Sequence, residues 1–78
     1  MKSVHSRTYQ RAIQELREAR ISAGMTQEQV AAQLRRPQSF VAKVERGERR
    51  IDVAEFIDFA RAVDAQPLKL FRRLLSSD

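Results

Sequence analysis

The side chains best suited to bind a ligand are gathered in one basic segment of this 78-residue chain. Positions 35–50 hold six basic residues against two acidic ones, so the segment carries +4 of the formal net charge of +5. The basic residues are Arg35, Arg36, Lys43, Arg46, Arg49 and Arg50. Concentrated positive charge on a small domain is typical of proteins that bind phosphate groups. A solvated charged surface has the same composition, so the choice depends on where these residues lie.

The composition offers little support for catalysis or metal binding. The chain has no cysteine and a single histidine, His5, which excludes a disulfide framework, a zinc finger, a thiolate nucleophile and a Ser-His-Asp arrangement. The ten carboxylates fall mostly on positions expected to be exposed or to cap helices. Apolar runs are too short for a membrane span or a secretory signal. We therefore expect a cytoplasmic protein that is not an enzyme, with no catalytic residue, metal, cofactor or membrane partner.

The pattern of apolar residues predicts an all-α domain. Two glycines and two prolines leave little material for hairpin turns, while 42% hydrophobic and 32% charged residues argue against disorder. Helical periodicity predicts a five-helix bundle in a single domain over 1–78, with a structured core over about 6–75. The expected helices cover roughly 6–23, 26–34, 37–46, 52–63 and 67–75.

Capping residues mark where several of these helices begin and end. Thr26 with Gln29, and Asp52 with Glu55, have the three-residue spacing of a capping box. Gly47 follows the third expected helix, where a left-handed residue commonly ends a helix. The predicted boundaries therefore depend on local hydrogen bonding as well as on periodicity.

The last two helices carry the apolar surface expected to complete the core. The inner stripe of the fourth contains Val53, Phe56, Ile57, Ala60 and Val63, with Phe59 at its edge. In the fifth, Leu68, Phe71 and Leu75 are expected to close the core. Leu70 and Leu74 then form a second stripe, which we predict to be a homodimer interface. The alternative is a deeply placed helix with both faces in the core.

Residues 26–46 have the organisation of a helix-turn-helix unit, with two short helices joined by about three residues. Ala31 is small enough for the helices to cross closely, and Val41 and Val44 can anchor the second helix to the core. The opposite face of the helix over 37–46 presents Gln38, Ser39, Ala42, Lys43 and Arg46. Such side chains can contact base edges in a DNA major groove, which admits a helix. Phe40 can either touch DNA or pack against the neighbouring helix.

The strings MTQEQVAAQL at 25–34 and PQSFVAKVERGER at 37–49 carry a family resemblance. From Leu16 to Phe71 the chain resembles the phage-repressor-type helix-turn-helix domain, the lambda Cro/CI or XRE family, and VERG is the most specific part of the match. The resemblance implies a lambda-repressor-like fold that binds double-stranded operator DNA, usually as a homodimer. The chain departs from the family at Arg35, where glycine is usual. A left-handed conformation there costs a residue with a Cβ on the order of 1 kcal/mol.

The resemblance also implies roles for individual side chains. Base contacts fall to Gln38, Ser39 and Lys43, and DNA phosphate contacts to Gln27, Arg46, Arg49 and Arg50. For Gln27 and Gln38, helix capping alone is the alternative. Arg20 lies close to the apolar stripe of the first helix and Glu45 on the buried side of the third. The resemblance places these two residues as a structural ion pair.

These observations predict a sequence-specific, DNA-binding transcriptional regulator of bacterial or phage type. It would bind a two-fold operator through the helix over 37–46 and block or recruit polymerase. The alternative is an antitoxin, with a toxin as its protein partner, or a controller protein of a restriction-modification system.

Overall fold

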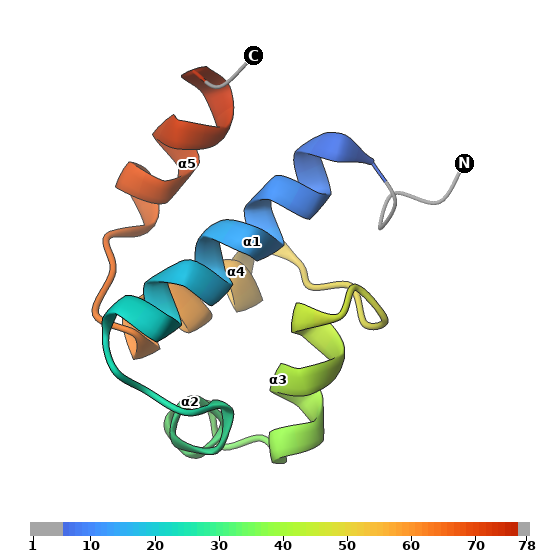
Figure 1. Ribbon diagram of the computed structural model, residues 1–78, viewed down its shortest axis with the longest axis vertical. Coiled ribbons are helices and arrows are strands. Elements are labelled where there is room, and N and C mark those ends of the chain that lie inside the picture. The colour runs from blue at the N-terminus through green and yellow to red at the C-terminus, as the bar shows by residue number, and fades with distance from the viewer. Residues whose placement is uncertain (1–5, 77–78) are drawn as a thin grey trace.

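The computed structural model describes residues 6–76, which form five helices (Figure 1). They are α1 (Arg7–Ser22), α2 (Gln27–Leu34), α3 (Gln38–Glu45), α4 (Val53–Ala62) and α5 (Pro67–Ser76). The all-α class is confirmed, and each helix boundary lies within one residue of its predicted position. The single histidine, His5, lies outside the described residues.

Helices α1, α2 and α4 begin at side-chain caps, which are Ser6, Thr26 and Asp52. Both predicted capping boxes are present: Thr26 accepts from the Gln29 backbone N–H, and Asp52 accepts from that of Glu55. In return, the side chain of Gln29 accepts from the Thr26 backbone N–H, and the side chain of Glu55 accepts from the Asp52 backbone N–H. Each box therefore satisfies two backbone donors that would otherwise be unpaired. Gly47 has φ +76° and follows the end of α3 as expected.

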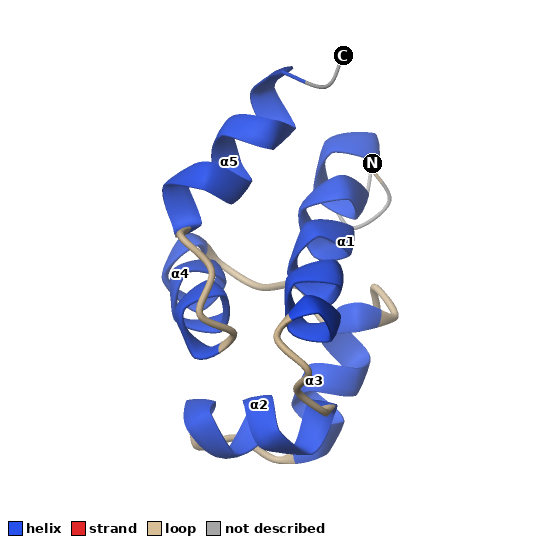
Figure 2. Cartoon of the chain, turned by 60° about the vertical axis from the view of Figure 1, so that its left-hand side comes forward, coloured by secondary structure: helices blue, strands red, loops and turns tan. Residues whose placement is uncertain are grey.

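The helices pack in an arrangement that leaves α3 at one end of the molecule. Helices α1 and α4 pack on each other, with α5 against both at one end and α2 and α3 at the other (Figure 2). Helix α2 packs on α3 and α4, and α3 also packs on α1. The most completely buried side chains are those of Leu16, Val30, Val41, Val44 and Phe59. Four helices contribute these five residues, so a common core holds α3 in place.

The predicted burial of two residues in α4 is wrong. Phe59, expected at the edge of the inner stripe, is only 1% exposed, because α1, α2 and α5 all pack on α4 and leave more than one narrow stripe of it in the core. Val53, expected in the stripe, is 70% exposed because it is the first residue of α4 and lies at the surface.

The two apolar stripes of α5 are reversed relative to the prediction. Leu70 is 4% exposed and belongs to the core, and Leu74 is half-buried, so these two residues do not form a free stripe. The exposed apolar residues are instead Leu68, Phe71 and Leu75. The two stripes are about 100° apart on one helix, so periodicity defines both and does not say which one faces α1 and α4.

Candidate nucleic-acid interface

The connection between α2 and α3 is a tight, closed turn. Arg35 adopts the left-handed conformation, with φ 57° and ψ 43°, although it carries a Cβ. Its backbone N–H donates to the Ala32 carbonyl at 3.1 Å, and that of Arg36 donates to the Ala31 carbonyl at 2.9 Å. Ala31 itself is 2% exposed. The departure from glycine therefore leaves the turn intact, and α3 begins directly after Pro37.

Helix α3 has one face in the core and one face in solvent. Val41 and Val44 are fully buried, as predicted, while Gln38, Ser39, Lys43 and Arg46 are exposed. Ala42, predicted on the outer face, is only 8% exposed. The longer side chains four residues before and after it, Gln38 and Arg46, flank it on the same side of the helix. Ala42 therefore has little surface to offer a base.

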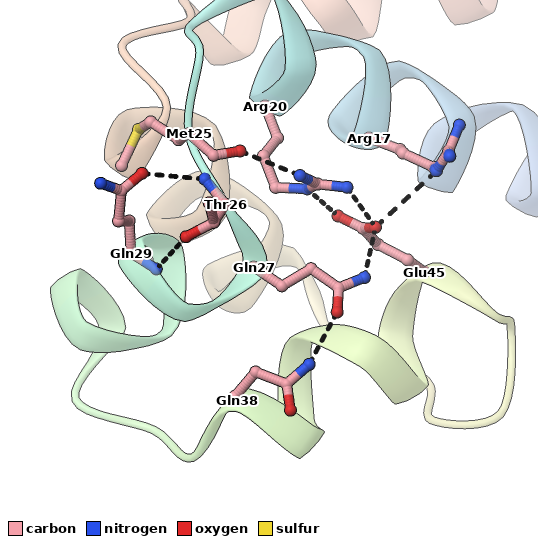
Figure 3. A network of polar contacts seen from close by, with 8 residues as sticks. All are labelled: Arg17, Arg20, Met25, Thr26, Gln27, Gln29, Gln38 and Glu45. Carbon is pink, nitrogen blue, oxygen red and sulfur yellow. Dashed lines mark hydrogen bonds and ion pairs between the residues drawn. The ribbon is translucent and has the colours of Figure 1, made fainter.

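A nearly buried ion pair joins α1 to the end of α3 (Figure 3). Arg20 Nε donates to Glu45 Oε2 at 2.6 Å and Arg20 Nη2 donates to Oε1 at 3.0 Å, which is a bidentate pair. The side chains are 12% and 4% exposed. Arg20 Nη1 also donates to the Met25 carbonyl at 2.9 Å. The predicted Arg20–Glu45 pair is present, and it ties α1, the α1–α2 connection and α3 together.

Two glutamines extend this ion pair toward the exposed face of α3 (Figure 3). Gln27 Nε2 donates to Glu45 Oε1 at 2.9 Å, and Gln38 Nε2 donates to Gln27 Oε1 at 2.8 Å. Because a carboxylate only accepts hydrogen bonds, Glu45 orients the Gln27 amide, and that amide in turn orients Gln38. Gln27 is half-buried and Gln38 exposed. The network therefore holds the first residues of α2 and α3 in a defined relative position.

The basic residues after α3 do not all behave alike. Arg46 pairs with Glu48 at 3.1 Å on the surface, and hydrogen bonding within this pair raises the pKa of Arg46 and lowers that of Glu48. Arg49 is held by Glu55 through contacts of 3.0 and 3.1 Å and also donates to the Arg50 carbonyl. Arg50 is exposed. The structure thus brings Arg49 against α4 and leaves Arg46 and Arg50 at the surface.

The structure brings four residues together beside α3, and sequence reasoning gave two of them, Arg36 and Glu55, no place in the site. The guanidinium groups of Arg36 and Arg49 both lie over the Phe40 ring, and both pair with Glu55. The sequence indicates Arg36 only as part of the basic segment and Glu55 only as a capping residue. Phe40 is 9% exposed, so of its two predicted roles it takes the packing one. No local pattern indicates this cluster, because Glu55 is 19 residues from Arg36.

Two other kinds of site find no support in the described part of the chain. Residues 6–76 contain no group of three or more acidic or histidine side chains placed to hold a metal ion. Over the same residues, no helix combines the length and the apolar character needed to cross a membrane.

The fold and this surface define a helix-turn-helix protein, since a core-anchored pair of short helices presents one of them to solvent beside a basic loop. The helix-turn-helix domain family matches residues 14–74. An XRE-family like protein from Pseudomonas syringae pv. tomato str. DC3000 is 47% identical, with a TM-score of 0.90, over 96% of this chain and 92% of that one. The chain belongs to the XRE family of helix-turn-helix proteins.

Two restriction-modification controller proteins have similar structures. The controller C.AhdI from Aeromonas hydrophila is 36% identical, with a TM-score of 0.69, over 78% of this chain and 92% of that one. The controller C.Esp1396I, solved as a tetramer with its natural 35 base-pair operator, has a TM-score of 0.81 over 91% of this chain and 93% of that one. Its identity of 18% makes it a likeness of fold. The comparison with curated proteins gave no match.

Proposed function

We propose that this protein is a sequence-specific DNA-binding transcriptional regulator that inserts α3 into the major groove of an operator in the bacterial cytoplasm. The observation that carries the proposal is the exposed polar face of α3, which the core and the Arg20–Glu45 network hold in place. A helix presented in this way fits the groove, and its first residues can reach base edges. The function requires binding and no catalytic step. Its effect at a promoter is to block or recruit polymerase.

Within this function the exposed residues divide into two groups. Gln38, Ser39 and Lys43 lie at the start and on the outer face of α3, where base edges are within reach. Gln27, Arg46, Arg49 and Arg50 lie around α3 and contact the phosphate backbone. Gln27 begins α2, where unpaired backbone N–H groups favour an anion. Base contacts specify the site, whereas phosphate contacts supply affinity and register.

We further propose that the regulator binds as a homodimer through the exposed apolar stripe of α5, formed by Leu68, Phe71 and Leu75. One recognition helix reads only a few base pairs, and a two-fold dimer doubles the site with half-sites about 34 Å apart. A continuous apolar surface on a small protein marks an interaction site. This stripe replaces the one formed by Leu70 and Leu74, because Leu70 is in the core.

Selection of bound sequences from a random duplex library tests the proposed function. We expect recovery of a two-fold sequence, and the recovered duplex should bind at least 10³-fold more tightly than a scrambled one. The matched control is a variant with Ser39→Ala and Lys43→Ala, which alters the outer face of α3 and leaves the core unchanged. Recovery of no preferred sequence, or the same sequence from parent and control, contradicts the proposal.

A restriction-modification controller is the more specific second candidate. It is favoured by the 36% identity to C.AhdI over 92% of that chain. The test is to locate the selected sequence in the source genome. A site directly upstream of this protein's own gene, beside genes for a methyltransferase and an endonuclease, supports the controller role, and a site far from such genes contradicts it.

A further inference from the structure

An aromatic ring and a carboxylate organise two arginines on the side of α3 that lies toward the first turn of α4. Arg36 comes from the α2–α3 turn, Phe40 from α3, Arg49 from the α3–α4 loop and Glu55 from the first turn of α4. We call these four residues the Phe40 cluster. Its members come from four consecutive parts of the chain and meet beside the recognition helix.

The two guanidinium groups are held by stacking and by ion pairing together. The Cζ atoms of Arg36 and Arg49 lie 4.4 and 4.9 Å from the centroid of the Phe40 ring. Arg36 Nη2 lies 2.9 Å from Glu55 Oε2, and Arg49 Nη1 lies 3.0 Å from Glu55 Oε1. Stacking on a ring and a planar fork of donors both restrict a guanidinium more than an ammonium group would be restricted. The cluster is therefore ordered before any ligand arrives.

The cluster keeps a positive charge that it can present to an anion. Two guanidinium groups against one carboxylate leave a net charge of +1, and the side chains of Arg36 and Arg49 are 41% and 39% exposed. A guanidinium has five N–H donors, and among the described residues Arg36 uses one of them, on Glu55. A phosphate oxygen is the acceptor that such an ordered, forked donor matches best.

We propose that Arg36 is a DNA-backbone contact, with Phe40 and Glu55 as the positioning residues that aim it. This inference rests on the proposed function. Gln27 lies on the side of α3 toward the start of α2, where it contacts Gln38, and the Phe40 cluster lies on the side toward the first turn of α4, where Arg36 contacts Glu55. With α3 in the groove, the two sides meet the two strands that border it. Arg36 and Gln27 then contact phosphates on opposite DNA strands, and together they fix the depth and tilt of α3 in the major groove.

The test is the salt dependence of binding to the selected duplex. Arg36→Ala should reduce the magnitude of the slope of log affinity against log salt by about one per protomer. At 0.1 M salt this corresponds to about an 8-fold loss per protomer, or about 60-fold for the dimer on its two-fold operator, and the loss disappears toward 1 M. Selected and random duplexes should lose affinity alike, because a phosphate carries no sequence. The unfolding midpoint should move by no more than about 5 °C, since the lost ion pair is at the surface.

Arg35→Gly is the matched control, because it removes the same charge from the adjacent position. Arg35 lines a groove with Asp58 and Arg61 between α2 and α4, and no member of the Phe40 cluster is among the residues that line it. Glycine also suits its left-handed backbone. This variant should keep the salt slope of the parent. If Arg36→Ala and Arg35→Gly have equal salt slopes, the inference is overturned, because any change in DNA binding then reflects only the lower net charge of the protein.

The positioning role of Phe40 has its own readout. Phe40→Leu should lower the salt slope, Phe40→Tyr should keep it because the ring remains, and Phe40→Leu should add little to Arg36→Ala. If Arg36→Ala binds with the parent's affinity and slope while selection still recovers an operator, this inference fails and the proposed function stands. If no duplex is preferred by the parent, the proposed function fails first. If Arg36→Ala or Phe40→Leu lowers the stability of the protein but leaves the salt slope of DNA binding unchanged, the Phe40 cluster only stabilises the fold and the inference is overturned.

Discussion

At the scale of single residues, Lys43 and Arg50 differ in what they can reach. Both are exposed, but Lys43 lies on the outer face of α3, whereas Arg50 lies in the loop after it. Lys43→Ala should cost about 1–3 kcal/mol on the selected operator and relax preference at one or two base pairs. Arg50→Ala should weaken binding to all duplexes alike and reduce the magnitude of the salt slope by about one per protomer. Titrations of selected and scrambled duplexes over a range of salt measure both effects. If Lys43→Ala preserves the parent's ratio of specific to random binding, Lys43 does not specify the site.

Glu45 shows how much a single buried carboxylate can depend on its partner. Its side chain is 4% exposed and receives two hydrogen bonds from Arg20 and one from Gln27. Arg20→Met should lower the free energy of unfolding by about 3–5 kcal/mol, because it leaves a buried charge without its main partner. Arg17→Met is the control, since Arg17 is 56% exposed and 3.8 Å from the same carboxylate. Urea denaturation of both variants measures the difference. If Arg20→Met and Arg17→Met lose the same free energy of unfolding, the burial of the Arg20–Glu45 pair does not set its contribution to stability.

At the scale of elements, the start of α4 should make stability depend on pH. The hydrogen bond from Arg49, followed by that from the Asp52 backbone, lowers the pKa of Glu55 below its ordinary value of 4.5. A carboxyl group with a lowered pKa contributes stability above its unfolded pKa and loses it as the pH falls through the folded one. Glu55→Gln keeps the cap acceptor and removes the charge. The parent should therefore be more stable than this variant at neutral pH, and the difference should shrink as the pH falls below about 4.5 and through the lowered pKa of Glu55. Urea denaturation across this range measures it, and a constant difference is the contrary result.

The turn between α2 and α3 stores backbone strain that glycine would relieve. Arg35 has φ 57°, where a Cβ costs about 1–2 kcal/mol, while glycine costs roughly 0.5–1 kcal/mol through the entropy of the unfolded chain. Arg35→Gly should therefore stabilise the fold by about 0.5–1 kcal/mol. Gly47→Ala is the reciprocal test, because Gly47 has φ +76° and nothing within 4 Å of an added Cβ. It should destabilise by about 1 kcal/mol through the backbone alone. Chemical denaturation gives both values, and a less stable Arg35→Gly contradicts the strain.

At the scale of the whole molecule, the exposed stripe of α5 should decide the oligomeric state. Leu68 and Leu75 are 69% and 77% exposed, so charging them should leave the core intact. Leu68→Glu with Leu75→Glu should give a folded monomer with much weaker operator binding, because the two half-sites are no longer linked. Sedimentation at tens of micromolar protein and a circular dichroism spectrum measure the two properties.

Ile21→Glu is the control for the dimer, since Ile21 is 51% exposed on α1 and should leave self-association unchanged. Leu70→Glu should instead unfold the protein, because this side chain is in the core. A monomeric parent that still binds its operator specifically excludes the α5 dimer.

The helices, and the face of α3 that points outward, follow from short-range patterns in the amino-acid sequence. The capping boxes at Thr26 and Asp52 and the glycine at 47 act on backbone groups a few residues away. They can therefore be predicted from the amino-acid sequence alone. The burial of Val41 and Val44 follows from helical spacing. The Arg20–Glu45 pair, by contrast, was predicted through family resemblance, because 25 residues separate its members.

The packing of the helices selects which stripe of α5 is buried and which residues surround the Phe40 ring. Leu70 and Leu68 are equally apolar, and the rotation of α5 against α1 and α4 places one in the core and the other in solvent. Arg36 meets Glu55 across 19 residues because α2 packs on both α3 and α4. Spacing along a chain defines which side chains share a face, whereas packing between helices selects the neighbour that each face meets.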